Sequence, residues 1–150
     1  MQSPVEEPLP REVALTGKAI REYFEDALAR EGSTLATWIV LHGIERGSWE
    51  NQRNLAKELR IEGATLTRHL DRIERDGLIS RTRDPDDRRQ VRAKLTPKGR
   101  ALHRRLKTTA QEFGARAMAG LTDDDQANLR RILARIRQNV EGAHADRRPA

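Results

Sequence analysis

The side chains with the clearest chemical meaning are the arginines and lysines between Leu78 and Arg100. This stretch holds eight cations against three aspartates, a balance of +5 within a chain of 150 residues whose net charge is +6. Guanidinium groups bind phosphates through paired hydrogen bonds, and clustered positive charge releases counterions when it binds a polyanion. The stretch therefore indicates a nucleic acid as partner, and a solvated basic surface is the alternative. Its cations are Arg81, Arg83, Arg88, Arg89, Arg92, Lys94, Lys98 and Arg100.

The segments around these cations predict a β-hairpin. "LISRTR" and "QVRAKL" partly alternate apolar with polar residues, as short strands do. Between them "DPDDRR" has turn chemistry, with φ preset by Pro85. Asp87 is expected to orient Arg89 rather than contact a ligand. Thr96 and Pro97 then predict the start of a helix.

A helix over residues 63–76 precedes the hairpin. Leu66, Leu70 and Ile73 form its apolar stripe. Threonine hydroxyls on the opposite face can bond phosphates or bases, and Arg68 can bond a guanine through two hydrogen bonds. A short helix, "QRNLAKEL", and a tight turn at residues 60–62 come before it. This is the order of a winged helix-turn-helix, in which the second helix, here 63–76, is the recognition helix. Its polar face carries Ala64, Thr65, Thr67, Arg68, Asp71 and Arg72.

Helices on both sides of this unit predict a dimer. Apolar stripes recur at helical spacing over residues 11–30, from residue 97 onward, and beyond Thr122. Unpartnered apolar stripes usually mark an interface, and a monomer whose helices cover one another is the alternative. The expected fold is mainly α (α+β). The expected organisation is a flexible arm at 1–10, a dimerisation region at 11–33 and 98–141, a DNA-binding domain at 34–97 and a flexible tail at 142–150.

Trp38 and His42 lie four residues apart in a predicted helix, "TLATWIVLHGIERG", and so share one face. They are candidates for a ligand site, and a core tryptophan stacked on a hydrogen-bonded histidine is the alternative.

Other kinds of chemistry find little support in the sequence. The four histidines lack zinc-binding spacing, and the absence of cysteine excludes disulfides and thiolate ligands. No phosphate-binding loop or nucleophile motif is present, so we expect neither an enzyme nor a cofactor or metal. The first ten residues do not resemble a signal peptide and the apolar stretches are too short to span a bilayer, so a cytoplasmic location without membrane contact is expected.

"LAKEL", "TLTRHLDRIERDGLISR", "DPDDRR" and "KLTPKGR" resemble the MarR family of bacterial transcription regulators. The resemblance covers about residues 11–141, and "TWIVLHGI" directs it towards the SlyA-like branch. It implies a homodimeric, ligand-responsive regulator, a repressor in our interpretation, that binds double-stranded DNA at a pseudo-palindromic operator.

The resemblance also assigns roles to individual residues. It places Thr65, Thr67 and Arg68 on the recognition helix, Arg89 in the minor groove, and a small aromatic acid near Trp38 and His42. Arg60 departs from it, because the family often has glycine in this turn. The competing hypothesis is an architectural protein that binds nucleic acid without sequence preference. The expected DNA-binding residues are Ala64, Thr65, Thr67, Arg68, Arg72, Arg83, Arg88 and Arg89.

Overall fold

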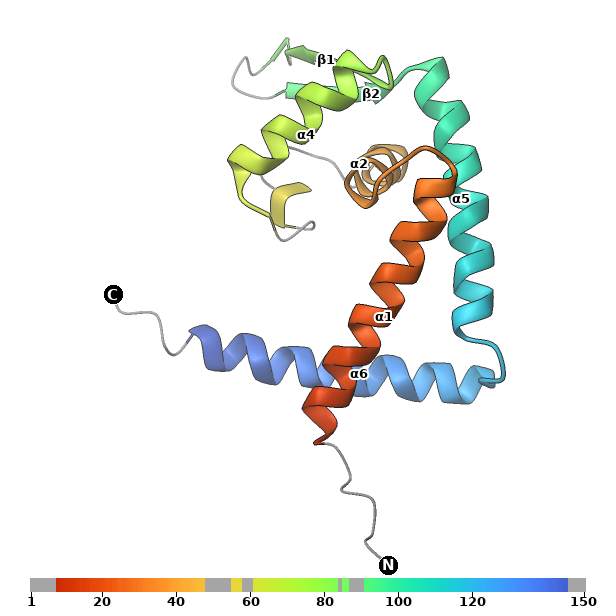
Figure 1. The fold of residues 1–150 in the computed structure, drawn as a ribbon. Coiled ribbons are helices and arrows are strands. Elements are labelled where there is room, and N and C mark those ends of the chain that lie inside the picture. Colours follow the sequence, from red (N-terminus) through yellow and green to blue (C-terminus); the bar gives the residue numbers. More distant parts are fainter. Residues whose placement is uncertain (1–7, 48–54, 58–60, 84, 87–90, 146–150) are drawn as a thin grey trace, which may run out of the picture. The chain divides into compact units, whose positions relative to one another are not determined.

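The computed structural model describes residues 8–47, 55–57, 61–83, 85–86 and 91–145. The chain divides into two compact units, Met1–Phe113 (unit 1) and Gly114–Ala150 (unit 2). Within the described residues it is mainly helical with one two-stranded antiparallel sheet, which confirms the predicted fold class (Figure 1). The elements are α1 (Leu9–Arg30), α2 (Leu35–Glu45), α4 (Gly63–Arg75), β1 (Ile79–Arg83), β2 (Val91–Leu95), α5 (Pro97–Ala117) and α6 (Asp123–Ala145).

The core of unit 1 forms where apolar stripes from separate helices meet. α2 lies at its centre and contacts α1, α4 and β2 (Figure 1). The predicted stripe of α4, Leu66, Leu70 and Ile73, is fully buried. Leu55, in the short helical segment 55–57, is also fully buried.

The ends of the helices follow local rules. Thr34 caps α2 by accepting a hydrogen bond from the Thr37 amide at 3.2 Å. Gly77 ends α4 with a φ of 72°, a value that glycine adopts without strain. α1 begins at Leu9, earlier than predicted, because a proline such as Pro10 fits the first turn of a helix, where amides lack intrahelical acceptors.

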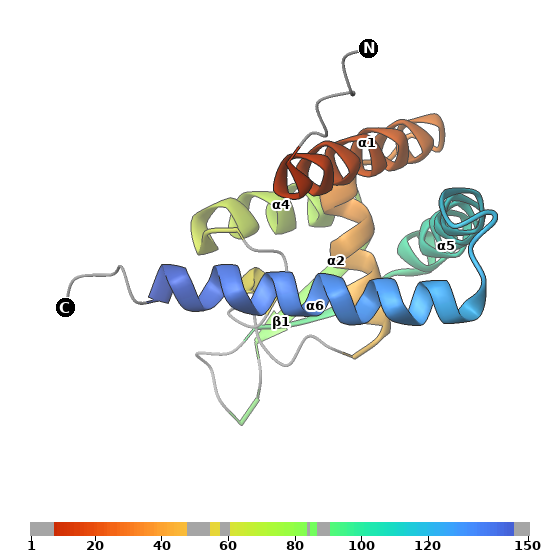
Figure 2. The same cartoon turned by 90° about the horizontal axis from the view of Figure 1, so that it is seen from below.

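Large apolar side chains remain exposed on α1 and on α6. Those of α6 lie along one uninterrupted helix (Figure 2), which continues to Ala145 rather than ending near residue 141. No helix in the described part of the chain is long and apolar enough to cross a membrane. The exposed side chains are Leu9, Val13, Leu15, Ile20 and Tyr23 on α1, and Leu129, Ile132, Leu133, Ile136 and Val140 on α6.

Candidate nucleic-acid interface

The polar face of α4 is open to solvent. Ala64, Thr65, Thr67, Arg68 and Arg72 are all exposed, on the side of the helix opposite its buried stripe. The hydroxyl of Thr67 donates a hydrogen bond to the Gly63 carbonyl at 3.0 Å, so its oxygen lies against the first turn. The first turns of α4 therefore present short polar side chains and one arginine, the groups that read base edges in a major groove.

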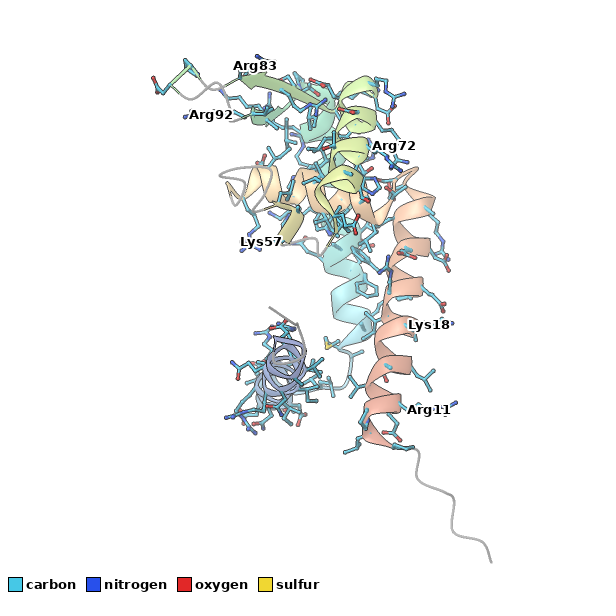
Figure 3. All side chains as sticks on the ribbon, turned by 90° about the vertical axis from the view of Figure 1, so that its left-hand side faces the viewer. Arg11, Lys18, Lys57, Arg72, Arg83 and Arg92 are labelled. Carbon is cyan, nitrogen blue, oxygen red and sulfur yellow. The ribbon has the colours of Figure 1, made fainter. Side chains whose placement is uncertain are left out.

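The predicted hairpin is present, with Ile79 paired to Leu95 and Arg83 paired to Val91. Arg83, Arg92 and Lys94 are exposed on its two strands. Figure 3 shows Arg83 and Arg92 on the hairpin and Arg72 on α4, all at the end of unit 1 opposite Arg11 and Lys18. The three predicted residues of the hairpin tip, Asp87, Arg88 and Arg89, lie outside the described residues, as does Arg60.

Arg81 differs from the other cations of the hairpin, because its side chain is only 20% exposed. Its guanidinium donates to Glu74 through Nε at 2.9 Å and through a terminal nitrogen at 2.7 Å. The same terminal nitrogen pairs with Asp71, and the Arg81 amide donates to the other Glu74 oxygen at 3.1 Å. The hydrogen bond from Arg81 is the main cause that lowers the pKa of Glu74, and burial opposes it. In the sequence, Arg81 counted as one of the exposed cations of the hairpin, which is the wing of the winged helix-turn-helix, and Asp71 as part of the polar face of α4. The structure pairs these two side chains with each other.

The start of α5 is attached to the turn between α4 and β1. The Thr96 hydroxyl donates to the Gly77 carbonyl at 2.6 Å and accepts from the Gly99 amide at 3.0 Å, so Thr96 caps α5 as predicted. The Thr96 amide donates to the Leu78 carbonyl at 3.1 Å, and a Cβ added at Gly99 would overlap that same carbonyl oxygen. Glycine is therefore required where α5 touches this turn.

Two further cations of the basic stretch bind the protein's own backbone. Lys98 donates to the Asp76 carbonyl at 2.8 Å, and Arg100 donates to the Leu95 carbonyl at 2.9 Å. Their charges still add to the local positive field, but these contacts hold the base of the hairpin and the start of α5. Within this stretch Arg81, Lys98 and Arg100 therefore bond groups of the protein itself, although Lys98 and Arg100 remain exposed, and Arg83, Arg92 and Lys94 are exposed on the strands.

Trp38 and His42 do share a face of α2, with ring centroids 4.5 Å apart. The structure adds His103 of α5, whose Nε2 lies 3.2 Å from the Nδ1 of His42 and whose ring stacks on Trp38 at 5.7 Å. Burial lowers the pKa of His103; Glu45 opposes this shift and Lys107 adds to it. His103 could not be assigned to this cluster from the sequence, because it lies 61 residues from His42 and its local pattern shows only a helix.

This cluster has few features of a metal site. Among the described residues, no three His, Asp or Glu side chains gather so that they could hold a metal ion. Phe24 of α1 also meets Trp38 edge to face at 6.4 Å, so that three helices contribute to the cluster. The arrangement fits a packed core of rings and also the border of a ligand site.

Comparisons with known proteins agree with this geometry. Residues 34–91 match the MarR family. The transcriptional regulator PA3341 is 30% identical, with a TM-score of 0.76 over 90% of this chain and 99% of its own. A mutant MarR from E. coli, complexed with operator DNA, is 28% identical, with a TM-score of 0.77 over 86% of this chain and 93% of its own.

A third solved structure, CouR from Rhodococcus jostii RHA1 bound to p-coumaroyl-CoA, is 24% identical, with a TM-score of 0.78 over 90% of this chain and 95% of its own. At that identity the likeness shows the fold alone. Together with α4 and the hairpin, these matches show that residues 34–91 are a MarR family domain and that the chain has the winged helix-turn-helix fold of MarR-type regulators.

Proposed function

We propose that this chain is a homodimeric repressor of transcription that binds a pseudo-palindromic operator. The observation that carries this proposal is the exposed row Thr65, Thr67 and Arg68 on α4, opposite a fully buried stripe. Arg72 of the same helix lies at the same end of unit 1 as Arg83 and Arg92 of the hairpin (Figure 3). A major groove accepts a helix presented in this way, and the wing can reach the neighbouring backbone. The E. coli MarR relative bound to operator DNA supports the same assignment.

Arg68 provides the direct test. Sequences bound by the protein are first selected from random DNA, and operator and random duplex are then compared at equal salt. Arg68→Ala should cost about 1–3 kcal/mol on the operator and relax the preference at one base pair. Lys18→Ala is the matched control, because it removes one exposed positive charge from α1, at the opposite end of unit 1.

Two results would count against this assignment. An equal loss on operator and random DNA would make Arg68 a phosphate contact only. A wild-type protein that selects no sequence at all would favour the architectural protein over the repressor.

The wing is proposed to supply affinity more than sequence preference. Arg83 is exposed at the end of β1, and Arg89 stays the predicted minor-groove contact, oriented by Asp87, with Arg88 beside it. Arg89→Ala should weaken binding to many sequences by a similar factor. It should also reduce the salt slope, which is the slope of log affinity against log salt concentration, by about one unit for one lost phosphate contact. An unchanged slope and affinity would remove the wing tip from the interface.

The dimer is proposed to form through the terminal helices, residues 11–33 and 98–141. Its support is the row of exposed apolar side chains on α6, of which Ile132 is 46% exposed and Ile136 37%. The double variant Ile132→Glu, Ile136→Glu should be a monomer or an aggregate by light scattering. Arg131→Glu, on the same helix and also exposed, is the control. A folded dimer of the double variant would exclude this face from the interface.

A small aromatic acid of the kind bound by the SlyA-like branch is proposed to release the operator by binding beside Trp38 and His42. Indole and imidazole rings offer a stacking surface together with hydrogen-bond donors for a carboxylate. Salicylate should quench the fluorescence of Trp38 in a Trp49→Phe background and should lower operator affinity. If Trp38→Ala leaves the loss of affinity unchanged, the acid binds elsewhere.

A further inference from the structure

We propose that Arg81 is a positioning residue of the DNA-binding surface: it joins the wing to the recognition helix through Glu74 and Asp71 and does not itself contact DNA. This inference rests on the proposed function, since it concerns how the same surface achieves its sequence preference.

The geometry makes Arg81 a bridge between two elements. It lies at the middle of β1, opposite Ala93 of β2, while both of its acidic partners belong to the C-terminal half of α4. Glu74 uses both carboxylate oxygens, one for the Arg81 amide and the other for its guanidinium. An isolated exposed ion pair contributes little, but a network of several hydrogen bonds to a half-buried guanidinium holds one geometry.

The charge of this trio argues against a role in holding phosphate. Arg81 contributes +1 while Asp71 and Glu74 contribute −2, so the group has a net charge of −1 on a surface that otherwise carries exposed cations. A negative group beside a polyanion opposes binding by simple Coulomb repulsion. The guanidinium also directs Nε and one terminal nitrogen at carboxylates. Positioning explains why an arginine of the wing is held by two acids.

The hairpin is attached to the end of α4 at its base as well as through Arg81. At the base of the hairpin, the Thr96 hydroxyl and amide bond the Gly77 and Leu78 carbonyls. Ile79 and Leu95, which pair at this base, are also buried in the core. The bridge at Arg81 lies two residues farther along β1, and it limits how far the outer part of the hairpin can bend relative to α4. The bridge thus fixes the distance between the base edges that α4 reads and the DNA backbone that the wing contacts. A fixed distance is what discrimination between sequences needs.

The two roles make opposite predictions for the acidic partner. If Arg81 positions the wing, Glu74→Gln should lower operator affinity about tenfold, the equivalent of one lost base contact, although it removes a negative charge. If Arg81 instead contacts DNA, Glu74→Gln frees it and should raise affinity for operator and random duplex alike. Glu62→Gln, at the other end of α4, is the control for the charge alone.

Variants of Arg81 complete the test. Arg81→Gln should reduce the ratio of operator to random affinity about tenfold and leave the salt slope unchanged, because no phosphate contact is lost. Arg83→Gln, two residues along the same strand, should instead reduce the slope. Arg81→Lys keeps the charge without the paired hydrogen bonds, and it should lose specificity as Arg81→Gln does. The exchange Arg81→Glu with Glu74→Arg should restore part of the ratio, which a general loss of fold stability would not allow.

The outcomes separate this inference from the proposed function. A fall in the salt slope of Arg81→Gln, or a gain of affinity in Glu74→Gln, overturns the positioning role while the repressor remains. A wild-type protein without preference for its selected operator overturns the proposed function itself. If Arg81→Gln fails to fold, Arg81→Lys and Glu74→Gln decide the question, each checked by circular dichroism at the temperature of the binding assay.

Discussion

The close backbone approach where α5 meets the turn after α4 yields the sharpest stability prediction. Gly99 is buried in the first turn of α5, and a Cβ at this position would overlap the Leu78 carbonyl oxygen. That oxygen cannot move cheaply, because it belongs to the backbone and accepts the Thr96 amide at 3.1 Å. Gly99→Ala should therefore separate α5 from the turn.

The expected cost follows from three contributions. Inserting one methyl group into a packed contact costs about 1–3 kcal/mol. Loss of the buried hydrogen bond between Thr96 and Leu78 adds about 1–3 kcal/mol. Alanine in a helix returns roughly 1 kcal/mol relative to glycine. The net loss is about 1–5 kcal/mol, which lowers the melting temperature by roughly 2–20 °C for a chain of this size.

The assay is urea unfolding followed by circular dichroism, at one fixed protein concentration because dimerisation contributes to stability. Gly114→Ala is the matched control: it lies on the same helix, and a Cβ there meets nothing within 4 Å. The control should be unchanged or more stable by up to about 1 kcal/mol. Equal stability of Gly99→Ala and wild type would refute the close approach and with it the reason for glycine at this position.

Two further predictions concern a titrating group and a helix cap. The pKa of His103 is lower in the folded protein than in the unfolded chain, so the unfolded chain takes up the proton first as pH falls. The free energy of unfolding should therefore decrease as pH drops below about 6.5, by no more than about 1.4 kcal/mol per pH unit. His103→Gln should flatten this dependence in urea titrations at pH 7.5 and 5.5; an identical pH dependence would assign it to other groups. Thr122 and Asp125 cap α6 reciprocally at 2.9 and 3.1 Å, so Thr122→Ala should cost about 1 kcal/mol while Thr122→Ser retains most of the cap. Equal thermal melts of the two Thr122 variants would contradict the cap.

The features that the sequence predicted correctly depend on neighbours within one or two turns of chain. The stripe Leu66, Leu70 and Ile73 was identified from helical spacing alone, and it is fully buried. Thr96 was identified as the start of a helix because an N-cap needs only its own side chain and an amide three residues on. The hairpin followed from alternation and turn chemistry, which are local as well.

Tertiary structure decided which of the charged and aromatic side chains are available. Arg81, Lys98 and Arg100 looked like further wing cations, yet each has a partner from outside its own turn of chain. His103 joined Trp38 and His42 only because α5 packs against α2. Such pairings depend on the path of the backbone over tens of residues, whereas a periodic pattern reports only which face of one helix or strand is apolar. Composition therefore predicted a basic wing, and packing determined which of its cations bond other groups of the protein and hold the wing in place.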